Sequence, residues 1–200
     1  MSCESHPLDR KVYILLTRFP GKVSMLLAVL TGCYYVHASI GLEDDLNTFY
    51  SFVTKGFIIE QIARYVRPDR VPYPCQLYEL PVSENVYQSI KYLLNTFVDA
   101  KDRLRYTKLG VFFGLLGIPY RRKEFCYFCT HFVAHILQNS GAAILQKNCT
   151  HYFSRDLKKL PGMKLCYQGN LQTMLIHFQL PQGVWDVSEH SCQETVSFHD

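Results

Sequence analysis

The sequence contains no long hydrophobic run and no strong excess of charge of either sign. Its best apolar run, Val23 to Leu30, is far shorter than the roughly 20 residues that a membrane-spanning helix needs. The 21 Lys and Arg against 17 Asp and Glu leave a formal net charge of +4, which is too weak to indicate a nucleic-acid partner. The basic clusters, such as Arg121-Arg122-Lys123, are short and typical of a solvated face.

The N-terminus also lacks the charged-then-apolar pattern of a signal peptide, because it reads MSCESHPLDRKVY. No repeat, low-complexity tract or internal linker interrupts the 200 residues. We therefore expect a cytoplasmic protein with no transmembrane segment, no nucleic-acid partner and no cofactor. We expect one domain over residues 1–200, with a polar tail from about residue 187 that frays.

Cysteine is abundant, with eight residues spread irregularly along a chain that is 48% hydrophobic. A chain of this length buries a substantial core without help from disulfides. The irregular spacing is therefore not typical of a disulfide scaffold, and we expect reduced thiols.

Short apolar segments separated by Gly, Pro and acidic turns alternate between strand and helix patterns. The predicted strands are 12–19, 34–42, 47–54, 75–82, 165–167 and 174–180. The predicted helices are 23–30, 56–66, one that follows a capping Ser83, 128–138, and a short turn after Ser154. The type of segment 108–118 is left open. Sequential β-hairpins mixed with helices indicate the α+β class.

The stretch CYFCTHFVAH places Cys126, Cys129, His131 and His135 within ten residues. Cys126 and Cys129 have zinc-ligand spacing, but His131 lies about 200° around a helix from Cys129. Structural zinc sites usually take ligands from two segments, and the sequence contains no second CxxC or HxxxH. A zinc-binding module using Cys126 and Cys129 stays open as an alternative, as does a redox-active pair.

The position of Cys129 favours a nucleophile. It falls in the first turn of an apolar-faced helix, where the free N–H groups and the helix dipole stabilise a thiolate and receive an oxyanion. Cys126 precedes the helix and is expected to be a buried thiol, and His131 and His135 face away from Cys129.

A cysteine nucleophile needs a base on a rigid element, and His37 lies in the middle of a predicted strand. Alternation puts His37 on the same face as Ser39 and opposite Ala38 and Ile40. A plain exposed strand histidine is the competing interpretation.

Three segments in order resemble the circularly permuted, NlpC-type, papain-like cysteine hydrolases of bacteria. They are YVHASIGL with the following FYSF, then YFCTHFVAHILQNSG, and later FSRDLKKLPGMKLCYQGNL. The resemblance implies a papain-like fold with an antiparallel sheet against helices, Cys129 as nucleophile and His37 as general base. It also implies a third polar residue on the strand after the histidine, for which Ser51 in FYSF is the candidate.

The resemblance further implies a thiol hydrolase that cleaves an amide or ester bond through an acyl-enzyme. Its substrate would be a small amide, a peptide, an isopeptide or a lipid-acyl group. The alternative is a non-catalytic descendant of the same fold that binds a ligand or a protein.

Overall fold

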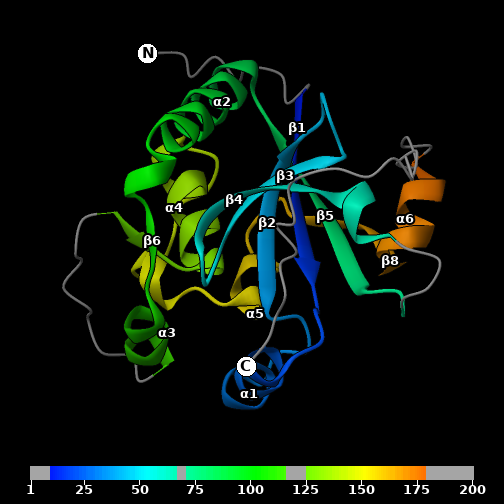
Figure 1. Ribbon diagram of the computed structural model, residues 1–200. Helices are drawn as coiled ribbons and strands as arrows, with labels where there is room; N and C mark the ends of the chain where they lie inside the picture. The colour runs from blue at the N-terminus through cyan, green and yellow to red at the C-terminus, as the bar shows by residue number, and fades with distance from the viewer. Residues whose placement is uncertain (1–9, 67–70, 116–124, 179–200) are drawn as a thin grey trace.

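The computed structural model describes residues 10–66, 71–115 and 125–178, in which a six-stranded sheet is surrounded by helices (Figure 1). The strand order is β4-β3-β2-β1-β5-β8, and every neighbouring pair is antiparallel. The strands are β1 Arg10–Thr17, β2 His37–Leu42, β3 Thr48–Val53, β4 Gly56–Gln61, β5 Pro74–Val82 and β8 Lys164–Asn170. The expected α+β class with an antiparallel sheet is confirmed.

Six α-helices and a small parallel pair of strands complete the described fold. The helices are α1 Lys22–Thr31, α2 Glu84–Asp99, α3 Lys108–Leu115, α4 Cys129–Asn139, α5 Ser154–Leu157 and α6 Leu171–His177. Strands β6 Arg105–Tyr106 and β7 Cys126–Tyr127 pair in parallel, and 3-10 turns cover Ile62–Tyr65, Lys101–Arg103 and Cys149–His151. None of the helices in these ranges has the length and apolar character that crossing a bilayer requires.

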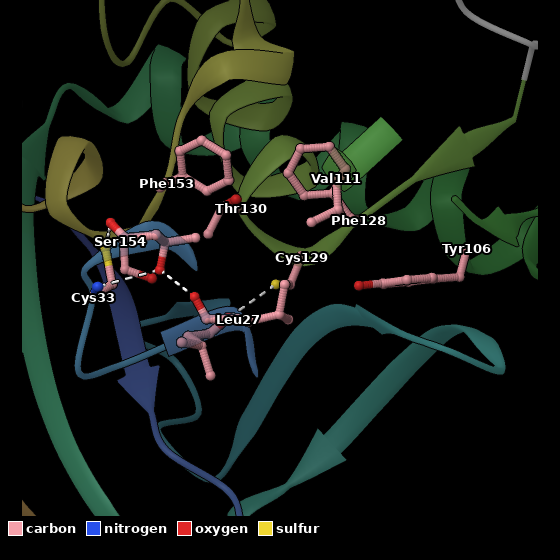
Figure 2. Close-up of a pocket in the computed structure, with 11 residues that line it drawn as sticks. Leu27, Cys33, Tyr106, Val111, Phe128, Cys129, Thr130, Phe153 and Ser154 are labelled. Carbon is pink, nitrogen blue, oxygen red and sulfur yellow. Dashed lines mark hydrogen bonds between the residues drawn. The ribbon is translucent and has the colours of Figure 1, made fainter. Parts of the chain in front are cut away.

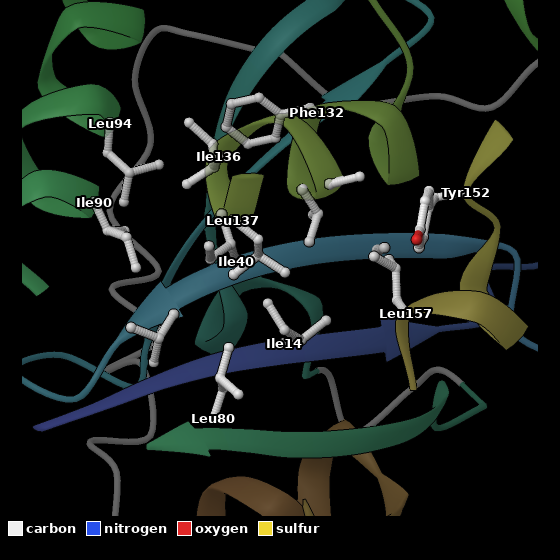
Figure 3. Packing of buried hydrophobic residues seen from close by; sticks show 14 of the residues in the cluster. Ile14, Ile40, Leu80, Ile90, Leu94, Phe132, Ile136, Leu137, Tyr152 and Leu157 are labelled. Atoms are coloured by element: carbon white, nitrogen blue, oxygen red, sulfur yellow. The ribbon is translucent and has the colours of Figure 1, made fainter. Parts of the chain in front are cut away.

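Strand β1 is buried on both faces, which explains its nearly continuous apolar sequence VYILL. Val12, Ile14 and Leu16 pack towards α2 and α4, whereas Tyr13 and Leu15 pack in the cluster that contains α6. Figure 3 shows the first of these cores, where strand side chains such as Ile14 meet the α4 side chains. The sheet is therefore a central layer, with α2 and α4 packed on one face and the smaller α6 on the other.

Helix α4 lies almost entirely inside the first core. Eight of its eleven residues are buried, from Cys129 to Leu137, so its N-terminus is held in place by packing on β2 and β3. Helix α2 begins as predicted, with Ser83 accepting a hydrogen bond from the Val86 N–H at 3.5 Å. The packing of α4 therefore holds Cys129 against the sheet.

Two element predictions are wrong. Segment 56–66, predicted to be helical, is strand β4 followed by a 3-10 turn, because Gly56 takes a φ of 121° in a tight turn that returns the chain against β3. Segment 174–180 begins inside helix α6, because Leu171, Met174 and Leu175 have helical spacing and pack in the second core.

Several predictions extend beyond the described residues. Segment 108–118 is helical over Lys108–Leu115, and its remainder lies outside the described ranges. The frayed tail from residue 187 and the cluster Arg121-Arg122-Lys123 also lie outside them.

Candidate active site

Cys129 and His37 come together although they are 92 positions apart in the chain. His37 is the first residue of β2 and Cys129 the first residue of α4. The Cys129 thiol lies 3.7 Å from the carbonyl oxygen of Val36, the neighbour of His37. The Cys129 side chain also interacts with the His37 imidazole and helps to raise its pKa.

The other side of the His37 imidazole contacts Glu60. His37 Nε2 and Glu60 Oε1 are 2.6 Å apart, and the Ser39 hydroxyl donates to Glu60 Oε2 at 2.8 Å. Both side chains of the His37–Glu60 pair are buried. Because Nε2 faces the carboxylate, Nδ1 is the ring nitrogen left for the Cys129 thiol.

The pKa of His37 reflects this enclosure. Burial alone lowers the pKa, but the charge of Glu60 and hydrogen bonds with Cys129 and Glu60 outweigh it and raise the pKa to about 10 from 6.5. The imidazole therefore carries a proton at neutral pH. The imidazolium lies between the Glu60 carboxylate and the Cys129 sulfur.

The expected alternation of β2 is confirmed around this pair. Ala38 and Ile40 face the first core, whereas His37 and Ser39 both reach Glu60. Phe19 also packs edge-on to the imidazole, with ring centroids 5.4 Å apart. These contacts leave the histidine little rotational freedom.

Cys129 opens onto a pocket between α1, α3 and α4 that contains about 330 Å³ of empty space, part of it open to solvent (Figure 2). Its walls are mostly apolar, and the larger apolar side chains are Leu27, Val36, Val111, Phe128 and Phe153. Tyr106 also lines the pocket, and Figure 2 shows its hydroxyl directed towards Cys129. Burial, and to a smaller extent the charge of Cys129, raise the pKa of Tyr106, so its hydroxyl keeps its proton.

The resemblance implied that Ser51 would orient His37, but the structure places Glu60 there instead. The Ser51 hydroxyl donates to the Ala38 carbonyl at 2.6 Å. The β2–β3 ladder pairs only Ile40–Tyr50 and Gly41–Phe49. Ser51 thus bonds a strand carbonyl beyond the end of that ladder, which is a structural role.

Glu60 is not among the site residues predicted from sequence, because segment 56–66 is predicted to be helical. The signal was present in the run GFIIEQ after the turn residues Thr54 and Lys55. Two β-rich runs joined by a short Gly-containing turn are typical of a hairpin. A single glutamate inside the apolar second strand then marks a buried carboxylate that needs a partner. Tyr106 gave no comparable signal.

The other polar residues of CYFCTHFVAH do not form a metal site. Cys126 is half-buried in β7, and His131 is buried with its ring stacked on Tyr127 at 4.8 Å. Within residues 10–66, 71–115 and 125–178, no three His, Cys, Asp or Glu side chains are arranged to hold a metal ion. Cys126 and Cys129 are both free thiols. The geometry therefore supports neither the zinc-binding module nor a formed redox disulfide.

Comparison with protein-family models gives no match to this chain, and no curated protein matches it either. The resemblance to permuted papain-like hydrolases thus rests on the quoted sequence segments alone.

Proposed function

We propose that this protein is a thiol hydrolase that cleaves amide or ester bonds through an acyl-enzyme. Cys129 is its nucleophile, His37 its acid–base group and Glu60 the residue that orients the imidazole. One observation carries the proposal, namely the buried imidazole between the Glu60 carboxylate, 2.6 Å away, and the Cys129 thiol. Covalent acyl transfer requires a nucleophile, a base beside it and a carboxylate that orients the base.

The raised pKa of His37 indicates how the reaction begins. Below about pH 10 the imidazole holds a proton, and transfer of the Cys129 proton to Nδ1 supplies it and leaves a thiolate. The thiolate attacks the substrate carbonyl carbon, and the carbonyl π electrons move to its oxygen. Collapse of this intermediate breaks the C–N or C–O bond, and His37 Nδ1 donates its proton to the departing amine or alcohol.

Hydrolysis of the acyl-enzyme uses the same groups in reverse. Neutral His37 takes a proton from water while the water oxygen attacks the thioester carbonyl. The second intermediate then releases the carboxylic acid and returns Cys129 as the thiolate beside imidazolium. Glu60 fixes the ring throughout, because its Oε1 contacts His37 Nε2 while its Oε2 accepts from the Ser39 hydroxyl.

Two kinds of donor are suited to stabilise the oxyanion. The first-turn N–H groups of α4 have no carbonyl in a preceding turn to bind, and no side chain caps the helix at Phe128. The protonated Tyr106 hydroxyl lines the same pocket and is directed towards Cys129 (Figure 2). The mostly apolar walls favour a substrate with an apolar group next to the scissile carbonyl.

The test is iodoacetamide labelling with mass-spectrometric assignment of each site. We expect Cys129 to label faster than Cys166, a thiol whose pKa burial raises to about 11. His37→Ala is expected to slow Cys129 by about tenfold or more, because the imidazolium no longer stabilises the thiolate. Ser51→Ala serves as the control, because its hydroxyl bonds the Ala38 carbonyl rather than the imidazole.

The proposal fails if Cys129 labels no faster than Cys166, or if removal of His37 leaves its rate unchanged. Either result favours the alternative of a non-catalytic binding protein with this fold. A positive result justifies a screen of amide and ester substrates with apolar acyl groups, with Cys129→Ala as the inactive reference.

A further inference from the structure

Helix α1 presents an apolar face to solvent. Four large apolar side chains on it are more than half exposed, namely Met25 (60%), Leu26 (58%), Val29 (77%) and Leu30 (54%). Their spacing places them along one side of the helix, whereas Leu27 and Thr31 on the other side line the Cys129 pocket. A contiguous exposed apolar surface of this kind marks an interaction site.

Cationic side chains lie near both ends of α1. The sequence has no Asp or Glu between residues 10 and 42, and Lys22 lies on the first turn of α1, three and four residues before Met25 and Leu26. Arg18 lies over the ring of exposed Tyr34 at 4.4 Å, just beyond the helix. Arg155 donates to the carbonyl of Thr31, the last residue of α1, at 3.0 Å, so it lies at the same end as Tyr34.

We propose that α1 docks the protein on the surface of an anionic membrane. The four apolar side chains enter the boundary between headgroups and acyl chains, while Lys22, Arg18 and Arg155 meet lipid phosphates. Tyr34 suits the same boundary, because its ring is apolar and its hydroxyl is polar.

The shape of the surface favours lipid over a folded protein partner. The exposed side chains lie along a single helix at the edge of the fold (Figure 1), and a fluid lipid surface can close around such a helix without a preformed complement. Docking in this orientation brings the Cys129 pocket close to the lipid, because α1 forms a wall of that pocket. The inference goes beyond the proposed chemistry and does not depend on it.

Vesicle flotation tests the inference. Wild type is expected to float with phosphatidylcholine–phosphatidylserine vesicles, to float poorly with phosphatidylcholine alone, and to detach as salt is raised. Leu26→Asp combined with Val29→Asp is expected to weaken binding by about tenfold or more, because two charges then enter the apolar boundary. Lys22→Glu is expected to weaken binding to anionic vesicles only.

Ile144→Asp is the matched control, because Ile144 is 91% exposed outside this face, and it is expected to bind like wild type. Circular dichroism confirms that each variant is folded. The inference is overturned if wild type does not float, or if Ile144→Asp weakens binding as much as the α1 variant. It is also overturned if the α1 variant abolishes a dimer seen by light scattering but leaves flotation intact. Cys129→Ala is expected to float normally, which separates this test from that of the hydrolase.

Discussion

At the scale of single residues, the His37–Glu60 pair is a buried charged pair and therefore depends strongly on its hydrogen bonds. Burying a carboxylate is costly unless it is paired and hydrogen-bonded. Both Glu60 oxygens have a partner, His37 on one and Ser39 on the other. Loss of one partner leaves the other charge buried, so the pair matters for stability as well as for any chemistry.

Glu60→Gln is therefore expected to lower the free energy of unfolding by about 3 kcal/mol and to slow the alkylation of Cys129. Urea unfolding followed by circular dichroism measures the first effect. The matched control is Glu79→Gln, whose carboxylate pairs with exposed Lys11 at 2.9 Å and is expected to matter by less than about 1 kcal/mol. Equal losses in the two variants would contradict a special role for Glu60.

The pH dependence of stability follows from the same pair. The pKa of His37 is raised from 6.5 in the unfolded chain to about 10 in the folded protein. A raised pKa means that the native state binds the proton more tightly than the unfolded chain does. The contribution of His37 protonation to the free energy of unfolding is therefore complete below about pH 6.5 and disappears as pH rises through about 10. We expect the stability difference between wild type and His37→Gln to shrink over that window. A difference that stays constant from pH 6 to pH 10 would contradict the pairing.

At the scale of elements, most strands and helices follow from local pattern. The segments that form β1, β3 and β5 combine β-branched and aromatic residues between turn signals, a pattern that predicts strands. Helix α2 is predicted by the capping Ser83 and by the helical periodicity that follows it. The helix prediction for segment 56–66 is wrong because FIIEQIARY has apolar residues at both helical and strand spacings, so the pattern alone does not distinguish the two. Pairing with β3, a contact outside the segment, decides between the two.

Helix α3 offers a test of element packing. A Cβ on Gly114 would lie 2.7 Å from the Thr150 backbone carbonyl, whereas a Cβ on Gly110 would meet the Thr107 side chain. Gly114→Ala is expected to destabilise the protein by about 1–3 kcal/mol, because backbone has to move. Gly110→Ala is expected to cost less, because a side chain adjusts and alanine favours helix. Thermal unfolding compares them, and a larger loss in Gly110→Ala would contradict this packing of α3.

At the scale of the whole molecule, the candidate site exists only in the assembled fold. His37, Glu60 and Cys129 come from β2, β4 and α4. We expect the labelling advantage of Cys129 to vanish in urea at the same midpoint as the circular dichroism signal. Buried Cys75, whose pKa burial raises to about 12, is expected to label faster after unfolding. Persistence of fast Cys129 labelling in the unfolded chain would trace its reactivity to local sequence alone.

The sequence by itself determined the fold class, the first-turn position of Cys129 and the alternation that sets His37 and Ser39 against Ala38 and Ile40. These depend on local periodicity and on helix ends, which neighbouring residues dictate. Only the tertiary structure decided that Glu60 contacts His37, that Ser51 instead bonds the Ala38 carbonyl, and that α1 is exposed beside the Cys129 pocket. Such contacts join residues far apart in the chain, and strand pairing and packing select them by satisfying buried charges, which no local pattern records.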